Sequence, residues 1–224
     1  MIWEKTVEFP DISSNQGLLV VYGTTLPSDL LLKNKILTKD ELYFANRIKS
    51  NGQKNTWISC RVTLRLMLGI YLHLNPTEIE LKKNHFGRLF IANSNLFFNL
   101  SHTDSSFLLG FNVGGRIGVD LEKLSGQEDL ASLIDYAFSP EETEYCLDGE
   151  LSARFLEIWT LKEAYLKAAG VGLVDNLSSV NVYGYVNNHI NQKQFCLKTF
   201  ICPNGETASL VYRNDQPINY IWLC

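Results

Sequence analysis

Strand-like and helical segments interleave along the whole chain, and this order constrains the fold more than any other feature of the sequence. A strand-like run at 18–26 precedes two helical segments, at about 38–49 and 55–74. Capping-box patterns begin at Thr38 and at Ser139, and further helices are predicted to begin near Ser139 and Ser152, the second of them ending at Gly170. The remaining predicted strands are 79–83, 88–92, 96–101, 106–113, 116–122, 179–186, 193–201, 207–212 and 217–222. This order predicts an α+β fold.

The two halves of the chain have a similar content of elements, with a seam near Gly114 to Gly118. Gly114-Gly115 is also a two-residue hairpin signal, which predicts that strands 106–113 and 116–122 pair with each other. We therefore expect two similar α+β subdomains, at 1–115 and 116–224, related by a pseudo-twofold arrangement. The cleft between such halves is a common place for an active site.

Composition and charge exclude several classes of protein. Hydrophobic residues make up 46% of the 224 residues, so a sizeable core is expected, and the formal charge of −4 argues against binding nucleic acid through bulk charge. No apolar run is long enough to cross a membrane, and no signal peptide is evident. The five cysteines lack C-x-x-C spacing. These features predict a cytoplasmic, monomeric protein with no membrane or nucleic-acid partner.

The segment Gly118 to Glu122 places two carboxylates on one side of a predicted strand. Because side chains alternate along a strand, Asp120 and Glu122 point the same way, about 6 to 7 Å apart. Like charges at that distance are unfavourable unless a cation lies between them or solvent screens them. Gly118 on the same face would let a ligand approach the backbone. The alternative is a solvated strand face.

A second segment carries charged side chains on one face of a predicted helix. At 3.6 residues per turn, Trp159, Glu163 and Lys167 are stacked along that face. The neighbouring tryptophan indicates that the face is partly buried, where a carboxylate needs a partner. The alternative is an exposed helix with a Glu-to-Lys (i, i+4) pair, and Lys162 is consistent with it.

An apolar run ends at Ser101 and His102. Adjacent residues on a strand point to opposite faces, so these two cannot form a nucleophile and base pair with each other. Hydroxyl, imidazole and backbone N–H donors at a strand end suit a phosphate, and the alternative is a strand end entering a turn. The sequence has no P-loop motif, and its histidines lack metal-ligand spacing. An all-oxygen site for a hard cation is therefore favoured.

Three blocks occur in order along the chain: FNLSH (98–102), GVDLEK (118–123), and FSPEE (138–142) followed by WTLKEAYLKAAGVGL (159–173). Together they resemble the Sfp-type 4′-phosphopantetheinyl transferases, from about Arg47 to Leu173. The resemblance implies a Mg²⁺-dependent enzyme that moves the phosphopantetheine arm of coenzyme A onto a serine of an apo acyl, peptidyl or aryl carrier protein. Adenosine 3′,5′-bisphosphate is the other product.

The resemblance also implies roles for single residues. Asp120, Glu122 and Glu163 match the metal-binding carboxylates, and Lys167 matches the lysine beside the reacting phosphate. Pyrophosphate oxygens and Mg²⁺ call for a few carboxylates plus waters, which this set can supply. Glu163 and a metal-bound water are both candidates for the base that activates the serine hydroxyl.

Five further residues match contacts to coenzyme A. Ser101 and His102 correspond to phosphate ligands of the family. Lys83 and Arg88 lie where the family has basic residues before and within a Gly-Lys-Pro segment, although the lysine is an arginine here and the proline is absent. Arg47 lies in the basic stretch implied to bind the 3′-phosphate. Cationic side chains of this kind suit a phosphate.

Two other functions remain open. One is a different Mg²⁺-dependent phosphotransferase that uses the same carboxylates, which a competition between coenzyme A and ATP would distinguish. The other is a catalytically silent paralogue that binds carrier proteins. The four residues Asp120, Glu122, Glu163 and Lys167 argue against the second, because a binding module has no physical need for all of them.

Overall fold

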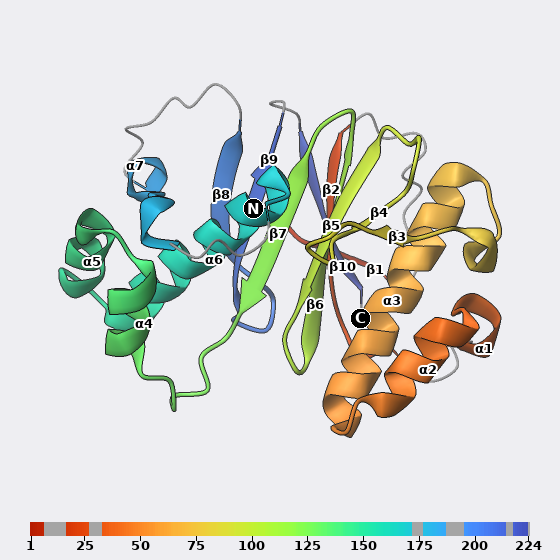
Figure 1. The fold of residues 1–224 in the computed structure, drawn as a ribbon, viewed down its shortest axis with the longest axis horizontal. Helices are drawn as coiled ribbons and strands as arrows, with labels where there is room; N and C mark the ends of the chain where they lie inside the picture. The colour runs from red at the N-terminus through yellow and green to blue at the C-terminus, as the bar shows by residue number, and fades with distance from the viewer. Residues whose placement is uncertain (7–16, 27–32, 172–176, 187–194, 214–216, 224) are drawn as a thin grey trace.

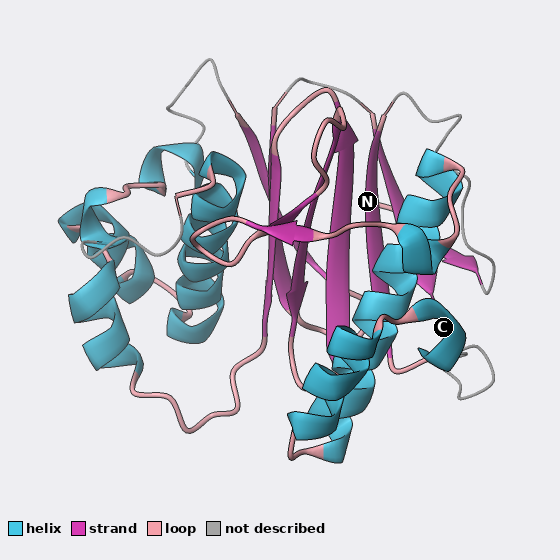
Figure 2. Cartoon of the chain, turned by 45° about the vertical axis from the view of Figure 1, so that its right-hand side comes forward, coloured by secondary structure: helices cyan, strands magenta, loops and turns pink. Residues whose placement is uncertain are grey.

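The computed structural model describes residues 1–6, 17–26, 33–171, 177–186, 195–213 and 217–223. Within them the chain folds as a mixed α+β structure, as expected. Strands form the middle of the molecule and helices flank them on two sides (Figures 1 and 2). Part of the predicted strand 193–201 and the end of the last family-like block, at 172–173, lie outside the described residues.

The first sheet has five strands among the described residues, in the order β1-β10-β2-β6-β5. Their bounds are β1 Glu4–Thr6, β2 Leu18–Thr24, β5 Leu96–His102, β6 Ser106–Val113 and β10 Ile218–Leu223. Neighbouring pairs are parallel from β1 to β2 and antiparallel from β2 to β5. Helix α3 (Asn51–Leu72) packs on this sheet, and its Leu64 and Met67 join Leu19 and Phe107 in a buried core.

The second sheet has three strands among the described residues, in the order β7-β9-β8, all antiparallel. They are β7 (Ile117–Glu122), β8 (Cys196–Ile201) and β9 (Thr207–Tyr212). Helix α6 (Leu151–Ala169) packs on this sheet. Apolar side chains of the two sheets, including Leu18, Leu108 and Val119, share one core cluster. The two sheets are therefore packed directly against each other.

Shorter elements complete the described fold. They are α1 Lys33–Ile36, α2 Lys39–Arg47, η1 Pro76–Glu78, β3 Lys82–Lys83, β4 Leu89–Phe90, α4 Leu130–Ala137, α5 Pro140–Leu147, η2 Leu177–Ser179 and α7 Tyr183–Val186. The predicted capping boxes at Thr38 and Ser139 are both present. Gly170 ends α6 in the left-handed conformation at φ 77°, as predicted. Helix α3 begins four residues before the expected Asn55, because Ser50 caps it.

The predicted hairpin between 106–113 and 116–122 is wrong. Strand β6 pairs with β2 and β5, whereas β7 pairs with β9 in the other sheet. Side chains of β7 press against β6 instead: a Cβ on Gly110 would lie 2.7 Å from Ile117 Cδ1 and 2.8 Å from Val119 Cγ1. The Gly114-Gly115 turn thus carries the chain from one sheet to the next rather than back along the same sheet.

The predicted strand at 179–186 is also wrong, since η2 and α7 occupy this segment. Its alternating valines and tyrosine resemble a strand, but side chains bond its backbone donors. The Tyr183 N–H donates to Asn181 Oδ1 at 2.9 Å, and the Val182 N–H donates to Glu142 Oε1 at 2.7 Å. These bonds favour a turn over a sheet ladder.

The predicted boundary between subdomains, at 115/116, falls in the connection from the first sheet to the second. Strand β10, however, returns from the predicted C-terminal subdomain to pair with β2 of the first sheet. Residues 116–224 therefore contribute to both sheets. The pseudo-twofold arrangement stays a prediction.

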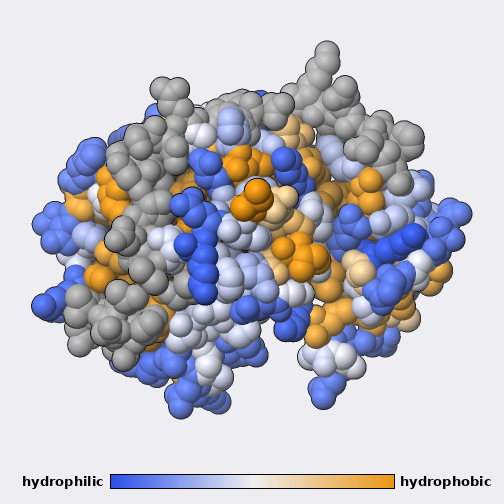
Figure 3. Space-filling model, turned by 180° about the vertical axis from the view of Figure 1, so that it is seen from behind, coloured by the Kyte–Doolittle hydropathy of each residue, from blue (hydrophilic) through white to orange (hydrophobic). Residues whose placement is uncertain are grey.

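The rear face of the molecule shows hydrophobic side chains in small patches among hydrophilic ones (Figure 3). None of the described helices combines the length and apolar character that a membrane-spanning segment needs.

Candidate functional site

The side chains of Ser101, Asp120 and Lys167, from three different elements, are in mutual contact. Lys167 Nζ, from α6, donates to Asp120 Oδ1 at 2.6 Å, and Ser101 Oγ, from β5, donates to the same oxygen at 2.9 Å. Lys167 Nζ also lies 3.3 Å from Ser101 Oγ. Asp120 is only 2% exposed, which contradicts the alternative of a solvated strand face. The structure therefore joins β5, β7 and α6, the elements of all three sequence blocks, at one carboxylate.

Gly118 sets the distance between β7 and α6. A Cβ at this position would lie 2.0 Å from Ala164 O and 2.5 Å from Ala168 N, so only glycine permits the observed approach. The expectation that Gly118 admits a ligand is therefore corrected, because the backbone of α6 occupies that space. This approach brings Lys167 within reach of Asp120.

The carboxylates at this site carry more negative charge than the neighbouring cation balances. Burial raises the pKa of Glu122 to about 7, and the nearby Asp120 raises it further, against the opposing effect of Lys167. Burial, and then Asp120, also raise the pKa of Glu163. Asp120 Oδ2 is buried without a hydrogen-bond partner. Such a group of interacting carboxylates favours an additional positive charge.

A hard divalent cation fits this donor set. Asp120, Glu122 and Glu163 offer carboxylate oxygens, the ligands that Mg²⁺ prefers, and the unpartnered Asp120 Oδ2 has a ligand atom to give. Among the described residues, no group of three or more acidic, histidine or cysteine side chains is already gathered in a metal-binding arrangement. Lys167 pairs with Asp120 rather than forming the (i, i+4) pair with Glu163 that the alternative interpretation expects.

A cavity of about 380 Å³ opens beside the carboxylates. It brings together Lys83, Arg88, Glu163 and Lys167, all named from the sequence, and adds Arg61 from α3. Asparagine, glycine and apolar side chains complete its wall. A cavity that joins several basic side chains to a carboxylate site suits a phosphate-containing ligand.

Arg47 and His102 lie outside the lining of this cavity. The Arg47 guanidinium is 5.7 Å from the centre of the Tyr43 ring, in a cation–π contact at the end of α2. His102 ends β5, and desolvation is the main cause that lowers the pKa of its imidazole, with Lys167 adding to the effect. A neutral imidazole keeps one N–H donor and one acceptor nitrogen.

Arg88 is held by backbone carbonyl groups. Its NH1 group donates to the Lys167 carbonyl, and its NH2 group donates to Ile117 O at 3.0 Å and to Phe98 O at 3.4 Å. Burial lowers the pKa of its guanidinium. Arg88 thus links the β3–β4 turn to α6, β7 and β5 at once.

Sequence reasoning missed two buried polar residues beside the site. Lys162 is 2% exposed and pairs with the fully buried Glu142 at 2.6 Å, so the interpretation of an exposed helix is wrong at this position. Asn99 Oδ1 accepts the Val119 N–H at 2.9 Å and so joins β5 to β7, which share no backbone ladder. An asparagine inside the apolar run FFNLSH was the signal for the second, because a buried amide needs a partner.

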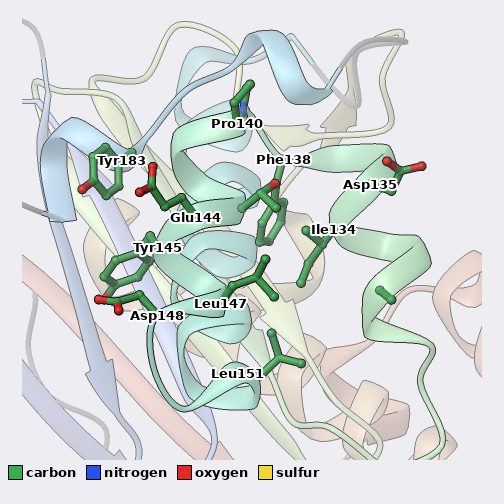
Figure 4. A pocket seen from close by; sticks show the side chains of 12 residues that line it. Ile134, Asp135, Phe138, Pro140, Glu144, Tyr145, Leu147, Asp148, Leu151 and Tyr183 are labelled. Carbon is green, nitrogen blue, oxygen red and sulfur yellow. The ribbon is translucent and has the colours of Figure 1, made fainter.

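A second cavity, of about 1060 Å³, lies elsewhere, between α4, α5 and α7. Figure 4 shows apolar side chains such as Ile134 and Leu147 at its centre and the carboxylates of Asp135, Glu144 and Asp148 around it. None of the residues predicted to bind metal or coenzyme A lines it.

A family model and several curated proteins match parts of this chain. The family model described as the 4′-phosphopantetheinyl transferase superfamily matches residues 116–220. The chain is 37% identical over 144 residues to the 4′-phosphopantetheinyl transferase HetI of Nostoc sp., which is 61% of each chain. It is 29% identical to a phosphopantetheinyl transferase of Thraustochytrium sp. over 61% of this chain and 54% of that protein. A 4′-phosphopantetheinyl transferase of Bacillus subtilis is 30% identical over 53% of each chain.

Residues 116–220 are similar to the 4′-phosphopantetheinyl transferase superfamily, and the similarity to HetI extends over 61% of the chain. The chain spans between half and about three fifths of the length of these relatives. The matched family region contains β7 and α6, which carry the carboxylates and Lys167.

Proposed function

We propose that this chain moves the 4′-phosphopantetheine arm of coenzyme A onto a serine of an apo carrier protein and releases adenosine 3′,5′-bisphosphate. The observation that carries the proposal is the meeting of Lys167, Ser101 and the partly unpartnered Asp120 beside a basic cavity. The superfamily match and the names of the relatives support the same reaction.

Asp120, Glu122 and Glu163 would hold the Mg²⁺ ion of this reaction. When bound, the ion would neutralise negative charge on the pyrophosphate group. The Lys167 ammonium contributes a second positive charge, because it lies at Asp120 and can donate to a phosphate oxygen as well. Ser101 Oγ donates to Asp120 and so places a neutral hydroxyl at the same position.

Coenzyme A would extend from the carboxylates along the basic cavity. Lys83 and Arg61 lie on its wall, and Arg61 also lines a neighbouring cavity of about 590 Å³. The Arg61 guanidinium lies 5.2 Å from the centre of the Trp57 ring, which fixes its direction. Lys83 and Arg61 are thus candidates for the adenosine 3′-phosphate, together with Arg47 and His102 from the family resemblance.

The chemical step is a displacement at the β-phosphorus of coenzyme A. The carrier serine oxygen forms a bond to this phosphorus, and the bond to the bridging oxygen breaks, so adenosine 3′,5′-bisphosphate leaves with that oxygen. Glu163 is the proposed acceptor of the serine proton. Glu163 lines the cavity together with Lys167, so its carboxylate lies beside the position proposed for the reacting phosphate.

The test is mass spectrometry of an apo carrier protein incubated with the chain, coenzyme A and Mg²⁺. We expect the carrier to gain the mass of one phosphopantetheine arm, and the gain to disappear when the carrier serine is replaced by alanine. An Asp120→Asn variant is the matched control, because it keeps the shape of the side chain and removes its charge.

Other outcomes would point to the competing functions. Transfer of a phosphoryl group from ATP, with no use of coenzyme A, would indicate a different phosphotransferase. Binding of the carrier without any mass gain, under conditions in which a known transferase modifies it, would indicate a silent carrier-binding protein. Either result would overturn the proposal.

A further inference from the structure

Arg88 lies in a turn whose shape is fixed locally. Asn84 Oδ1 accepts the N–H groups of Phe86 at 3.0 Å and Arg88 at 2.9 Å, and the Asn84 N–H donates to Arg88 O at 2.9 Å. Gly87 has φ 81°, a left-handed conformation that glycine adopts without strain. The turn therefore holds the backbone of Arg88 in one position, from which its side chain leaves the β3–β4 hairpin.

The three carbonyl groups that Arg88 bonds belong to the same three elements as Ser101, Asp120 and Lys167. Phe98 precedes Ser101 by three residues on β5, and Ile117 precedes Asp120 by three residues on β7. The third carbonyl belongs to Lys167 itself. One guanidinium thus connects every strand and helix that contributes to the cluster at Asp120.

Side chains and close packing, rather than backbone ladders, hold these elements against one another. Strands β5 and β7 belong to different sheets, and between them the Val119 N–H donates to Asn99 Oδ1 and Ser101 Oγ donates to Asp120 Oδ1. The carbonyl groups in the last turn of a helix have no partner within the helix, so the Lys167 carbonyl needs an outside donor. A guanidinium supplies several donors in a fixed plane and can satisfy carbonyls from more than one element.

We propose that Arg88 is a positioning residue: its guanidinium holds α6, β7 and β5 in register, so that Lys167 and Ser101 stay on Asp120. This role differs from the coenzyme A contact expected of Arg88 from the sequence, and it rests on the proposed function only where catalysis is the readout. The ammonium of a lysine keeps the charge but cannot span three carbonyls on three elements. Arg88→Lys therefore separates the two roles.

Steady-state kinetics with coenzyme A and with dephospho-coenzyme A form the first part of the test. We expect Arg88→Lys and Arg88→Ala to lower kcat about 10- to 100-fold with both substrates, since a displacement of about 1 Å at a reacting group costs this much. The KM for coenzyme A should change less than threefold. A variant Arg88→Lys with wild-type kcat, or a rise of KM in Arg88→Ala confined to coenzyme A, would overturn the proposal and assign Arg88 to the phosphate.

Hydrogen exchange, measured without substrates, forms the second part and does not depend on the proposed function. The amides of α6 near its end, including Gly170 N–H bonded to Leu166 O, should exchange at least tenfold faster in Arg88→Lys than in the wild type. Arg116→Ala is the matched control. Arg116 also donates to a carbonyl at the end of α6, Ala169 O at 2.6 Å, but its side chain is exposed and it bonds none of the three carbonyls that Arg88 bonds.

The two parts separate the possible failures. Unchanged exchange in both Arg88 variants would overturn the positioning role, whatever the enzyme does. Absence of transfer by the wild-type protein would overturn the proposed function, and the exchange result would still decide for or against Arg88 as the link between the elements. A loss of stability in Arg88→Lys with unchanged kcat per folded molecule would also reject the proposal, because it would show a structural role alone.

Discussion

Replacing Gly118 by alanine should damage catalysis, because the added methyl group meets the backbone of α6. The new Cβ would lie 2.0 Å from Ala164 O, whereas ordinary contacts begin at 3.4 Å, so β7 and α6 must separate by about 1.4 Å, the difference of these two distances. The colliding atoms belong to the helix backbone and cannot rotate away. The separation therefore displaces Asp120 from Lys167 directly.

Two magnitudes follow from this displacement. Overpacking of a tight contact costs about 1–3 kcal/mol of unfolding free energy, and the backbone clash at Gly118 puts the expected loss at the upper end of that range. A misplacement of about 1 Å lowers the rate about 100-fold. We expect Gly118→Ala to fold, to lose about 2–3 kcal/mol in urea unfolding, and to lower kcat for carrier modification about 100-fold.

Gly52→Ala is the matched control, because it adds the same methyl group in ordinary space. Its Cβ would lie 3.8 Å from Ser50 Oγ and 3.9 Å from Asp104 O, near the beginning of α3. Alanine is favoured over glycine inside a helix by about 0.5–1 kcal/mol, so this variant should be as stable as the wild type or more stable, with unchanged kcat. Wild-type kcat and stability in Gly118→Ala would refute the role of close packing in positioning the site.

The remaining predictions concern the buried charges. Asp120→Asn should lower the rate of transfer by about 100-fold or more. In EDTA, its unfolding free energy should stay equal or rise, because the change relieves repulsion among the carboxylates. Retention of transfer at low Mg²⁺ would contradict the metal assignment. Lys162→Met should cost about 3–5 kcal/mol in urea unfolding, because the Glu142 carboxylate is left buried without its cation. A further Glu142→Gln change should recover part of this loss, since it removes the charge and keeps an acceptor for the Val182 N–H. A cost below about 1 kcal/mol would exclude a tight buried pair. In EDTA, the unfolding free energy should fall by about 2 kcal/mol, after discounting for partial exposure, as pH rises from about 4.5 through 7, because the folded protein holds the Glu122 proton, owing to the raised pKa, and the unfolded chain releases it. Glu122→Gln should remove this part of the pH dependence. An unchanged profile in that variant would reject the pKa shift.

The sequence predicted the ends of the helices better than the arrangement of the strands. Capping boxes and the glycine at 170 are local signals, since the residues that bond are three or four positions apart, and these helix ends were confirmed. Strand pairing is a long-range property. Gly114-Gly115 has the composition of a hairpin, but whether β6 pairs with β7 depends on the availability of β2 and β9, which lie far away in the sequence.

The candidate site shows the same division between local and long-range information. Alternation along β7 correctly placed Asp120 and Glu122 on one side of the strand, opposite Val119, which lies in the core. It did not reveal that α6 covers that side, because the contact depends on the packing of residues far apart in the sequence, such as Gly118 and Ala164, 46 positions apart. Lys162 was misread for the same reason, since its partner Glu142 lies on another helix.

The residues of β7 and α6 divide into those that belong to the site and those that hold the elements together. On α6, Glu163 and Lys167 face the cavity, whereas Lys162 anchors the other side of the helix to Glu142. On β7, Asp120 belongs to the site and Gly118 admits the helix. The chemistry of a carboxylate and lysine cluster requires distances near 3 Å, and no single element can supply them. The residues that set these distances are therefore as specific to the site as the groups that would contact the phosphates. Substitutions in either set should lower kcat. Only substitutions of the positioning residues should also change hydrogen exchange in the absence of substrate.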